Sequence, residues 1–369
     1  MPEAIHSAIQ TPAGRPGPAG SPAPAPALQR VNPLEVPDWD ALVRSHPDYT
    51  IFHGSAWARV LIESYGFEPV YVAAMAGGRL LALLPCMEVN SRLTGRRGVC
   101  LPFTDACPPL GSDSIPSDAL LEELVAQGQE RRWRSIECRG RASMATRMPS
   151  SLAYFGHSLD LAAGEDQLFA GFDGAVRRAI RKAEKCGVQV EVGDTLDAVR
   201  TYYALHCQTR RKHGLPPQPI SFFDRLHRHV IDRKLGFVAI ASFWGAPVAG
   251  VVILHFGTKA VFKYGASDAS FQECRASNMA MWHAIRTCLE RGCTILDFGR
   301  TSLENDGLRR YKLGWGAAEH RIEHIKYDLR RHECVTEHDR ATGWHNRVFR
   351  LLPMRISRLI GAMLYPHIA

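Results

Sequence analysis

The sequence predicts a mixed α/β fold, with α+β mixed sheets, in which one strand-rich unit occurs twice. The segments GFEPVYVAAMAGGRLLALLPCMEV (66–89) and GFVAIASFWGAPVAGVVILHFG (236–257) both begin with Gly-Phe and contain two apolar runs separated by small turn residues. This is the pattern of a β-hairpin. Each segment is followed by a predicted helix, a short turn and a further strand, over 120–140 and 279–300. A helix placed between strands in this way indicates one mixed sheet per unit.

The boundaries of four regions follow from this repeat and from composition. Residues 1–30 are rich in Pro, Ala and Gly, and we expect them to be disordered because nothing in them could offset the entropy of ordering. They also lack the basic and apolar regions of a signal peptide. The two units are expected over 31–158 and 159–328, and a basic tail over 329–369.

Bulk properties limit the class of partner. The net charge of +8 favours anionic partners such as nucleotides, phosphates, tRNA or an acidic membrane surface. No apolar stretch approaches the ~18–20 residues of a membrane span. The ten cysteines include no C-x-x-C pair and no His cluster completes a metal spacing, so we expect free thiols and no metal.

A basic helix is predicted at the start of the second unit, over DGAVRRAIRKAEKCGV (173–188). Its apolar positions fall on one helical face and its cations on another, within roughly 140°. Arg178 and Arg181 belong to that basic face. It is either a solvated surface or a docking surface for phosphate.

Two further segments place polar groups at the ends of predicted elements. In QTRRKHGLPPQP (208–219), Arg211 and Lys212 stand at a helix end before a Pro-fixed corner, where they could complement the helix dipole or pair with a phosphate or carboxylate. In VFKYGASD (261–268), strand alternation predicts that Phe262 and Tyr264 share a face. Tyr264 is either a core aromatic residue or part of a ligand site.

The most unusual stretch is DFGRTSLENDGLRRYKLGWGA (297–317). It follows a predicted buried strand directly, and it combines cations, aromatic residues and glycines. Asp297 is a candidate base or substrate-orienting group, with a capping role as the alternative, and Arg300 could pair with a phosphate or carboxylate. Acyl transfer needs a group that accepts a proton and a group that stabilises oxyanion charge. No Ser-His-Asp or Cys-His set is evident, so direct transfer is the simpler mechanism.

Four stretches together carry a family resemblance: RRAIRKAEKCGV (177–188), YYALHCQTRRKHGLPPQPISFFDRL (202–226), VFKYGASD (261–268) and LDFGRTSLENDGLRRYKLGWG (296–316). With them the chain resembles FemAB-like peptidyltransferases, related to the enzymes of peptidoglycan interpeptide bridges. These proteins have GNAT-type (acyl-CoA N-acyltransferase) domains, and some belong to exopolysaccharide or PEP-CTERM (exosortase) loci. The resemblance implies tandem GNAT-like domains, with a FemAB-like second domain.

The resemblance also implies an activity and site residues. It implies an acyl- or aminoacyltransferase that acts on a nucleotide- or lipid-linked cell-envelope or exopolysaccharide precursor. GLRRYKLGWG looks like the family's G-L-x-x-F-K-x-G-F-G, which assigns electrostatic stabilisation to Lys312. It assigns substrate binding to Tyr264, Tyr311 and the region of Arg211 and Lys212.

The acyl donor is expected to be a co-substrate, with no tightly bound cofactor. GNAT enzymes hold the CoA pyrophosphate with an R/Q-x-x-G-x-G/A loop at a helix N-terminus, but the matching segment, DASFQECRASNMA (268–280), contains no glycine. This favours aminoacyl-tRNA over acyl-CoA as donor. The alternatives are a standard acetyl-CoA-dependent N-acetyltransferase and a non-catalytic polysaccharide-assembly or tRNA-binding protein.

The C-terminal segment NRVFRLLPMRISRLIGAMLYPHIA (346–369) is amphipathic, with arginines on one side and apolar residues largely opposite. Such a segment suits the anionic cytoplasmic leaflet of a membrane, or it docks on its own domain. We therefore expect a cytoplasmic protein, with peripheral contact at the inner face of the membrane as one use of this tail.

Overall fold

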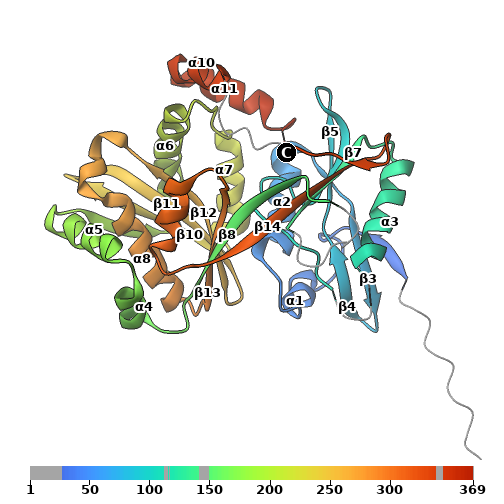
Figure 1. Ribbon diagram of the computed structural model, residues 1–369, viewed down its shortest axis with the longest axis horizontal. Coiled ribbons are helices and arrows are strands. Elements are labelled where there is room, and N and C mark those ends of the chain that lie inside the picture. Colours follow the sequence, from blue (N-terminus) through green and yellow to red (C-terminus); the bar gives the residue numbers. More distant parts are fainter. Residues whose placement is uncertain (1–26, 112–114, 116, 141–148, 338–343, 369) are drawn as a thin grey trace, which may run out of the picture.

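The computed structural model describes residues 27–111, 115, 117–140, 149–337 and 344–368. Figure 1 shows two α/β halves side by side, the N-terminal half in blue and cyan and the C-terminal half in green to orange. The disordered leader expected over 1–30 lies largely outside the described residues, but its end is ordered, because β1 (Leu28–Val31) pairs with β3.

The N-terminal half contains the first predicted hairpin, β3 and β4, which turns at Gly77 and Gly78 with positive φ angles of 56° and 72°. The predicted helix and the strand after it are α3 and β7. The elements of this half are β1 (Leu28–Val31), α1 (Trp39–Arg44), η1 (Ile51–His53), α2 (Ser55–Tyr65), β2 (Glu68–Pro69), β3 (Tyr71–Ala76), β4 (Arg79–Leu84), β5 (Met87–Ser91), β6 (Gly95–Val99), α3 (Ser117–Glu130) and β7 (Ser135–Arg139).

The C-terminal half repeats this order, with the second predicted hairpin as β10 and β11 and the following helix and strand as α8 and β13. Its elements are β8 (Leu152–Asp160), α4 (Glu165–Gly171), α5 (Gly174–Lys185), β9 (Gln189–Gly193), α6 (Leu196–Lys212), α7 (Ile220–Leu226), η2 (His227–Ile231), β10 (Gly236–Phe243), β11 (Ala246–Phe256), β12 (Lys259–Ser267), η3 (Ala269–Cys274), α8 (Ala276–Glu290), β13 (Ile295–Ser302), α9 (Asp306–Leu313), β14 (Ala318–Asp328), β15 (Glu333–Cys334), α10 (Trp344–Leu351) and α11 (Met354–Leu364).

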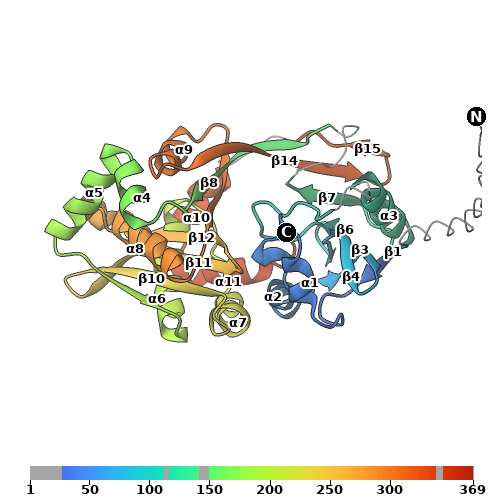
Figure 2. The ribbon, with the colours of Figure 1, turned by 90° about the horizontal axis from the view of Figure 1, so that it is seen from below.

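One large sheet passes through both halves. Its strand order is β2-β5-β6-β7-β14-β8-β13-β12-β11-β10-β9, and β1, β3 and β4 form a separate small sheet. β14 pairs antiparallel with β7 of the N-terminal half and with β8, and Figure 2 shows β8 and β14 running between the two halves. The boundary expected between residues 158 and 159 therefore falls inside β8.

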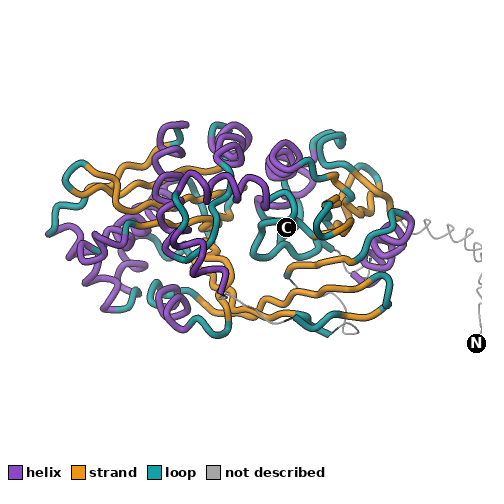
Figure 3. Tube along the Cα trace, turned by 90° about the horizontal axis from the view of Figure 1, so that it is seen from above, coloured by secondary structure: helices purple, strands orange, loops and turns teal. Residues whose placement is uncertain are grey.

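Helices cover both faces of the C-terminal sheet (Figure 3). α5 and α8 pack into the core on one side, and α6 and α7 into the core on the other. α5 buries Val176, Ile180 and Ala183, as the apolar face of the sequence predicts. The core beneath α6 and α7 continues into the N-terminal half, where the Trp57 ring meets the Phe222 ring edge-on, with ring centroids 6.2 Å apart. The halves therefore share apolar packing as well as a sheet.

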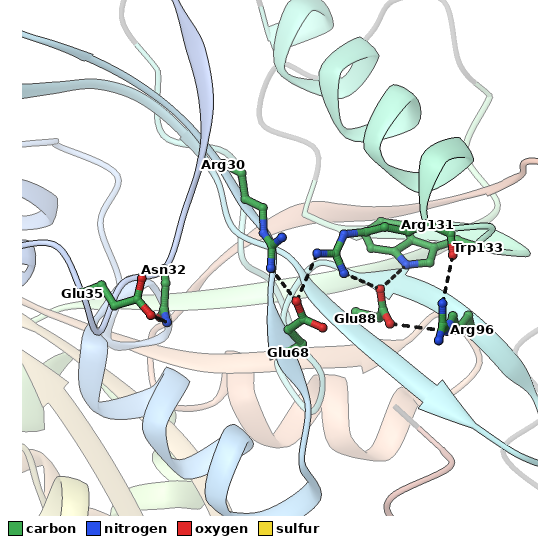
Figure 4. Close-up of polar contacts among 8 residues, drawn as sticks. All are labelled: Arg30, Asn32, Glu35, Glu68, Glu88, Arg96, Arg131 and Trp133. Atoms are coloured by element: carbon green, nitrogen blue, oxygen red, sulfur yellow. Dashed lines mark hydrogen bonds and ion pairs between the residues drawn. The ribbon is translucent and has the colours of Figure 1, made fainter.

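A buried carboxylate fixes the far end of the N-terminal sheet (Figure 4). Glu88, on β5, is 6% exposed, and it accepts hydrogen bonds from Arg131 at 2.8 Å and from the Trp133 indole at 2.7 Å. Arg131 also binds Glu68 at 3.1 Å. Because a buried charge is costly without partners, this network ties β2, β5 and the turn after α3 together.

The structure corrects one prediction about β12. Phe262 packs with Phe298 on the α8 side of the sheet, whereas Tyr264 packs with Phe223 on the α6 side. The pairing of β11 with β12 skips Lys263, because Val252 pairs with Tyr264 and Ile253 with Phe262. A β-bulge of this kind changes the alternation of side chains, so the prediction that the two rings share a face is wrong.

The C-terminal tail forms α10 and α11, which lie at the upper edge of Figure 1 above α6. Tyr365, at the end of α11, is buried, and Arg210 of α6 donates a hydrogen bond to its hydroxyl at 3.0 Å. Of the two uses predicted for the tail, docking on its own domain is thus observed. None of the helices that the structure describes is long and apolar enough to cross a membrane.

Candidate active site at the junction of the two halves

The candidate site is built on an irregularity at the centre of β13. The pairing of β13 with β8 shifts register between Asp297 and Arg300, and Gly299 has a φ of 70°. The Asp297 carboxylate accepts a hydrogen bond from the Gly299 N–H at 2.7 Å. The segment that follows the predicted buried strand is therefore a bulge, which turns its backbone carbonyls out of the sheet ladder.

Lys312 occupies the space beside this bulge. Its side chain comes from α9, and its Nζ donates hydrogen bonds to the carbonyls of Gly299 at 2.8 Å and Arg300 at 2.9 Å. The residue is 2% exposed. Burial lowers the pKa of Lys312 to about 8, against the opposing effect of Asp105 and Asp297. Burial also raises the pKa of Asp297.

A loop of the N-terminal half brings a second carboxylate, Asp105, to the same place. The Arg300 Nε lies 3.6 Å from an Asp105 oxygen. The Nε2 of His324 lies within hydrogen-bond distance of the Asp105 carbonyl oxygen, at 3.1 Å. Burial lowers the pKa of His324 to about 4, so this ring is neutral. A Cβ at position 299 would lie 2.3 Å from the Asp105 carboxylate, so the close approach requires glycine.

The same loop has a strained backbone. Leu101 and Phe103 have φ angles of 53° and 61°, in the left-handed region that non-glycine residues rarely adopt. Lys263, the bulged residue of β12, donates a hydrogen bond to the Phe103 carbonyl, and its ammonium lies 5.1 Å from the centroid of the Tyr264 ring. Burial lowers the pKa of Lys263 to about 8. Strain of this kind persists where surrounding contacts determine the loop, and it is common at functional sites.

The junction site, defined as Asp105, Lys263, Asp297, Arg300 and Lys312, can therefore do acid–base and electrostatic chemistry. The side chains of Asp105 and Arg300 are 30% and 37% exposed, so a ligand can reach them, while Lys312 lies beneath. A carboxylate can accept a proton, and the partly desolvated cations next to it can stabilise developing negative charge.

A separate basic pocket lies on the other side of α9. It has a volume of about 540 Å³ and is lined by one side of α5, by the N-terminal end of α8 and by residues along α9. Its polar lining includes Asp173, Arg178, Lys182, Arg275, Asn278, Arg310 and Tyr311. Helix N-termini and arginines both favour anions, so this pocket suits a phosphate-bearing ligand.

The loop that lacks glycine nevertheless has the backbone conformation that glycine would favour. Arg275 precedes α8 with φ 56° and ψ 26°. When Gln272 is aligned with the first position of the R/Q-x-x-G-x-G/A pattern, Arg275 stands at the position of its first glycine. The left-handed turn in front of α8 is therefore present although the loop contains no glycine.

The predicted site residues thus fall into several places. Asp297, Arg300 and Lys312 meet at the junction site, and Arg178 and Tyr311 line the basic pocket. Arg211 and Lys212 line a third hollow of about 390 Å³ with Arg350 and Met354. Arg181 lies over the Phe169 ring, with its guanidinium carbon 5.8 Å from the centroid. The hydroxyl of Tyr264 is buried without a hydrogen-bond partner, among aromatic rings.

Sequence reasoning missed Asp105, Lys263 and His324. Asp105 lies in PFTDACPP of the first unit, which matches no motif, and only the packing of the two halves brings it to β13. The one local signal was the position of Lys263 next to Tyr264. In the described ranges, no group of three or more His, Cys, Asp or Glu side chains could hold a metal ion.

Comparisons with known proteins agree with the fold. The model of an acetyltransferase (GNAT) domain matches residues 172–321. The crystal structure of FemX superposes with a TM-score of 0.59 at 13% identity, over 80% of this chain and 96% of that one. A tandem GNAT protein from the clavulanic acid biosynthesis pathway gives a TM-score of 0.54 at 10% identity, over 82% and 98%.

A third solved structure has the same fold. L-PGS from Bacillus licheniformis gives a TM-score of 0.50 at 13% identity, over 87% of this chain and 96% of that one. No curated protein matches the sequence significantly.

The protein therefore has a tandem GNAT fold, and residues 172–321 match the model of a GNAT acetyltransferase domain. The resemblance to FemAB-like proteins that the sequence predicts is confirmed by the likeness to FemX at the level of the fold.

Proposed function

We infer that the protein transfers an acyl or aminoacyl group directly to an amine or hydroxyl of a cell-envelope or exopolysaccharide precursor. The observation that carries this inference is the junction site itself, where two carboxylates and three cations from both halves meet. It lies inside the stretch that matches an acetyltransferase domain model, apart from Asp105.

The proposed step begins with an attack of the acceptor's amine or hydroxyl on the acyl carbonyl carbon. Asp105 accepts the acceptor's proton, because its side chain is 30% exposed and open to a ligand. Lys312, with Arg300, stabilises the developing oxyanion. The carbonyl then re-forms, the bond to the donor's oxygen or sulfur breaks, and the proton on Asp105 passes to that leaving atom.

The basic pocket supports a phosphate-bearing donor. Aminoacyl-tRNA and acyl-CoA both carry phosphates, and α9 presents Tyr311 to this pocket and Lys312 to the junction site. A donor held in the pocket would thus contact α9, the same short helix that carries Lys312, which stabilises the donor's acyl oxygen. The acceptor, nucleotide- or lipid-linked, would bind nearer Asp105.

A second candidate function is that of a standard acetyl-CoA-dependent N-acetyltransferase. The left-handed backbone at Arg275, in front of α8, favours it, because this conformation exposes helix N–H groups to a pyrophosphate.

Thermal unfolding separates the donors. We expect the melting temperature of the purified protein to rise with aminoacyl-tRNA or with a lipid-linked sugar. A rise with acetyl-CoA alone would support the second candidate. A rise with a donor but no product from any acceptor would instead support a non-catalytic binding protein.

A further inference from the structure

The two C-terminal helices are fixed to the protein through one face only. Ser357, Gly361 and Tyr365 are the buried residues of this face of α11. A Cβ at position 361 would lie 2.0 Å from the Pro217 carbonyl oxygen, so glycine lets α11 touch the loop after α6. α10 is held through Asn346, whose side-chain amide donates a hydrogen bond to the His213 carbonyl at 3.1 Å.

The opposite face of both helices is apolar and uncovered. At 100° per residue, Ile356, Leu359 and Met363 lie on the side of α11 opposite its buried residues. They are 46%, 63% and 65% exposed. In α10 the same holds for Leu351, which is 83% exposed. We call this surface the apolar ridge; its members are Val348, Leu351, Ile356, Leu359, Met363 and Ile368.

Within the tail, the charged side chains around the apolar ridge are all positive. Residues 344–368 contain four arginines and no Asp or Glu. The tail ends against another basic hollow, of about 620 Å³, in which His367 and Ile368 lie among cations of both halves. Its charged lining consists of Arg97, Arg134, Lys326, Arg330 and Arg331, with Glu137 and Asp328.

The turn between β5 and β6 extends this surface. Thr94 donates a hydrogen bond to the His367 carbonyl at 3.2 Å, and the neighbouring Leu93 is 67% exposed. Figure 1 shows this hairpin and the two tail helices at the same edge of the molecule. Exposed apolar groups from both halves therefore lie on one side.

We propose that this side of the protein binds the surface of an anionic lipid bilayer, with the apolar ridge immersed and the arginines at the headgroups. Helices of 8 and 11 residues are too short to span a bilayer but suit its interface. A second copy of the chain would bring like charges together, which costs energy. Anionic headgroups instead complement both the arginines and the basic hollow.

Such docking would also hold the junction site near the membrane. The ring of Tyr365 lies 5.6 Å from the ring of Phe103, whose carbonyl accepts the hydrogen bond from Lys263. A lipid-linked acceptor would then reach the site from the surface on which the protein sits. This last point rests on the proposed function, whereas membrane binding itself does not.

The test is cosedimentation of the full chain with vesicles, without any donor or acceptor. The vesicles are phosphatidylcholine alone, or phosphatidylcholine with roughly one third phosphatidylglycerol. Leu359→Asp combined with Met363→Asp should weaken binding to the anionic vesicles by more than about tenfold, because acidic groups replace side chains that would be immersed. Arg347→Gln combined with Arg355→Gln should weaken it roughly 30-fold, at about tenfold per 1.4 kcal/mol and 1 kcal/mol per arginine.

Trp244→Asp is the matched control. Trp244 is 88% exposed in the turn between β10 and β11, at the far end of the C-terminal half, and this variant should bind as the wild type does. All the replaced side chains are solvent-exposed, and unchanged melting temperatures would verify that the variants fold.

Three results would overturn the proposal. The wild type could fail to bind anionic vesicles, or the aspartate variant could bind them as well as Trp244→Asp does. Alternatively, size-exclusion chromatography could show a dimer that the aspartate variant converts to a monomer, which would make the apolar ridge a self-association surface. Loss of transfer activity with intact vesicle binding would contradict the proposed function and leave this proposal standing.

Discussion

Replacement of Lys312 by methionine should slow transfer strongly without unfolding the protein. The variant loses two charge-assisted hydrogen bonds, to the carbonyls of Gly299 and Arg300, each contributing about 1.5–3 kcal/mol. It also removes a buried charge. A pKa of about 8 in place of 10.5 means that burial of this charge costs about 3 kcal/mol, at 1.36 kcal/mol per pKa unit. The two effects offset, so the net loss of stability should be roughly 0–3 kcal/mol.

The effect on transfer should be much larger. Loss of a group that stabilises an oxyanion costs about 10²–10³-fold in kcat. The assay is mass spectrometry of the acylated acceptor, with unfolding in urea measured on the same preparations. Lys185→Met, in the exposed basic face of α5, is the matched control. Transfer by Lys312→Met within threefold of the control would refute the role of Lys312.

The same variant tests the pKa. Below pH 8, Lys312 is protonated in both the folded and the unfolded protein, so the full cost of its burial is present. Above pH 10.5 it is neutral in both, so the cost is gone. The free energy of unfolding should therefore increase as the pH rises between these two values, because the cost of burying the charge of Lys312 disappears. The gain should be about 3 kcal/mol smaller in Lys312→Met. Lys263 contributes similarly to both proteins, so an identical pH dependence would contradict the assignment.

Three further substitutions test the packing of the site and of the first sheet. Asp105→Asn should lower transfer at least about 100-fold with little change in melting temperature, because the side chain is partly exposed; normal turnover would exclude it as proton acceptor. Gly299→Ala should cost about 1–2 kcal/mol from its φ of 70°, and should also reduce transfer, since the new Cβ meets Asp105; unchanged transfer would show that Asp105 need not lie there. Gly98→Ala should cost about 1–3 kcal/mol, because its Cβ would lie 2.2 Å from the Trp133 ring; a melting temperature equal to that of the wild type would contradict this packing.

Local patterns were sufficient for the repeat and for much of the C-terminal half. The glycine pair at 77–78 and the apolar stripe of α5 determine a hairpin and a buried helical face, and both depend on near neighbours only. The bulge at Lys263 could not be read in this way, because it depends on how β12 pairs with β11. Strand alternation therefore gave the wrong face for one ring.

The candidate site was predictable only where its residues share one strand–helix unit. Asp297, Arg300 and Lys312 lie within a short segment, and they come together because α9 follows closely after the bulge in β13. Asp105 comes from the other half of the chain, and it reaches β13 only because β14 crosses to pair with β7. Such an arrangement depends on long-range topology, which no local pattern encodes.

The most direct test of the account is the mass of the envelope precursors in cells that contain either the wild-type protein or Asp105→Asn at equal levels. The account predicts that nucleotide- or lipid-linked precursors carry one additional acyl or aminoacyl group with the wild type, and that this mass disappears with the variant. Identical precursor masses in the two strains would contradict acyl transfer at the junction of the two halves.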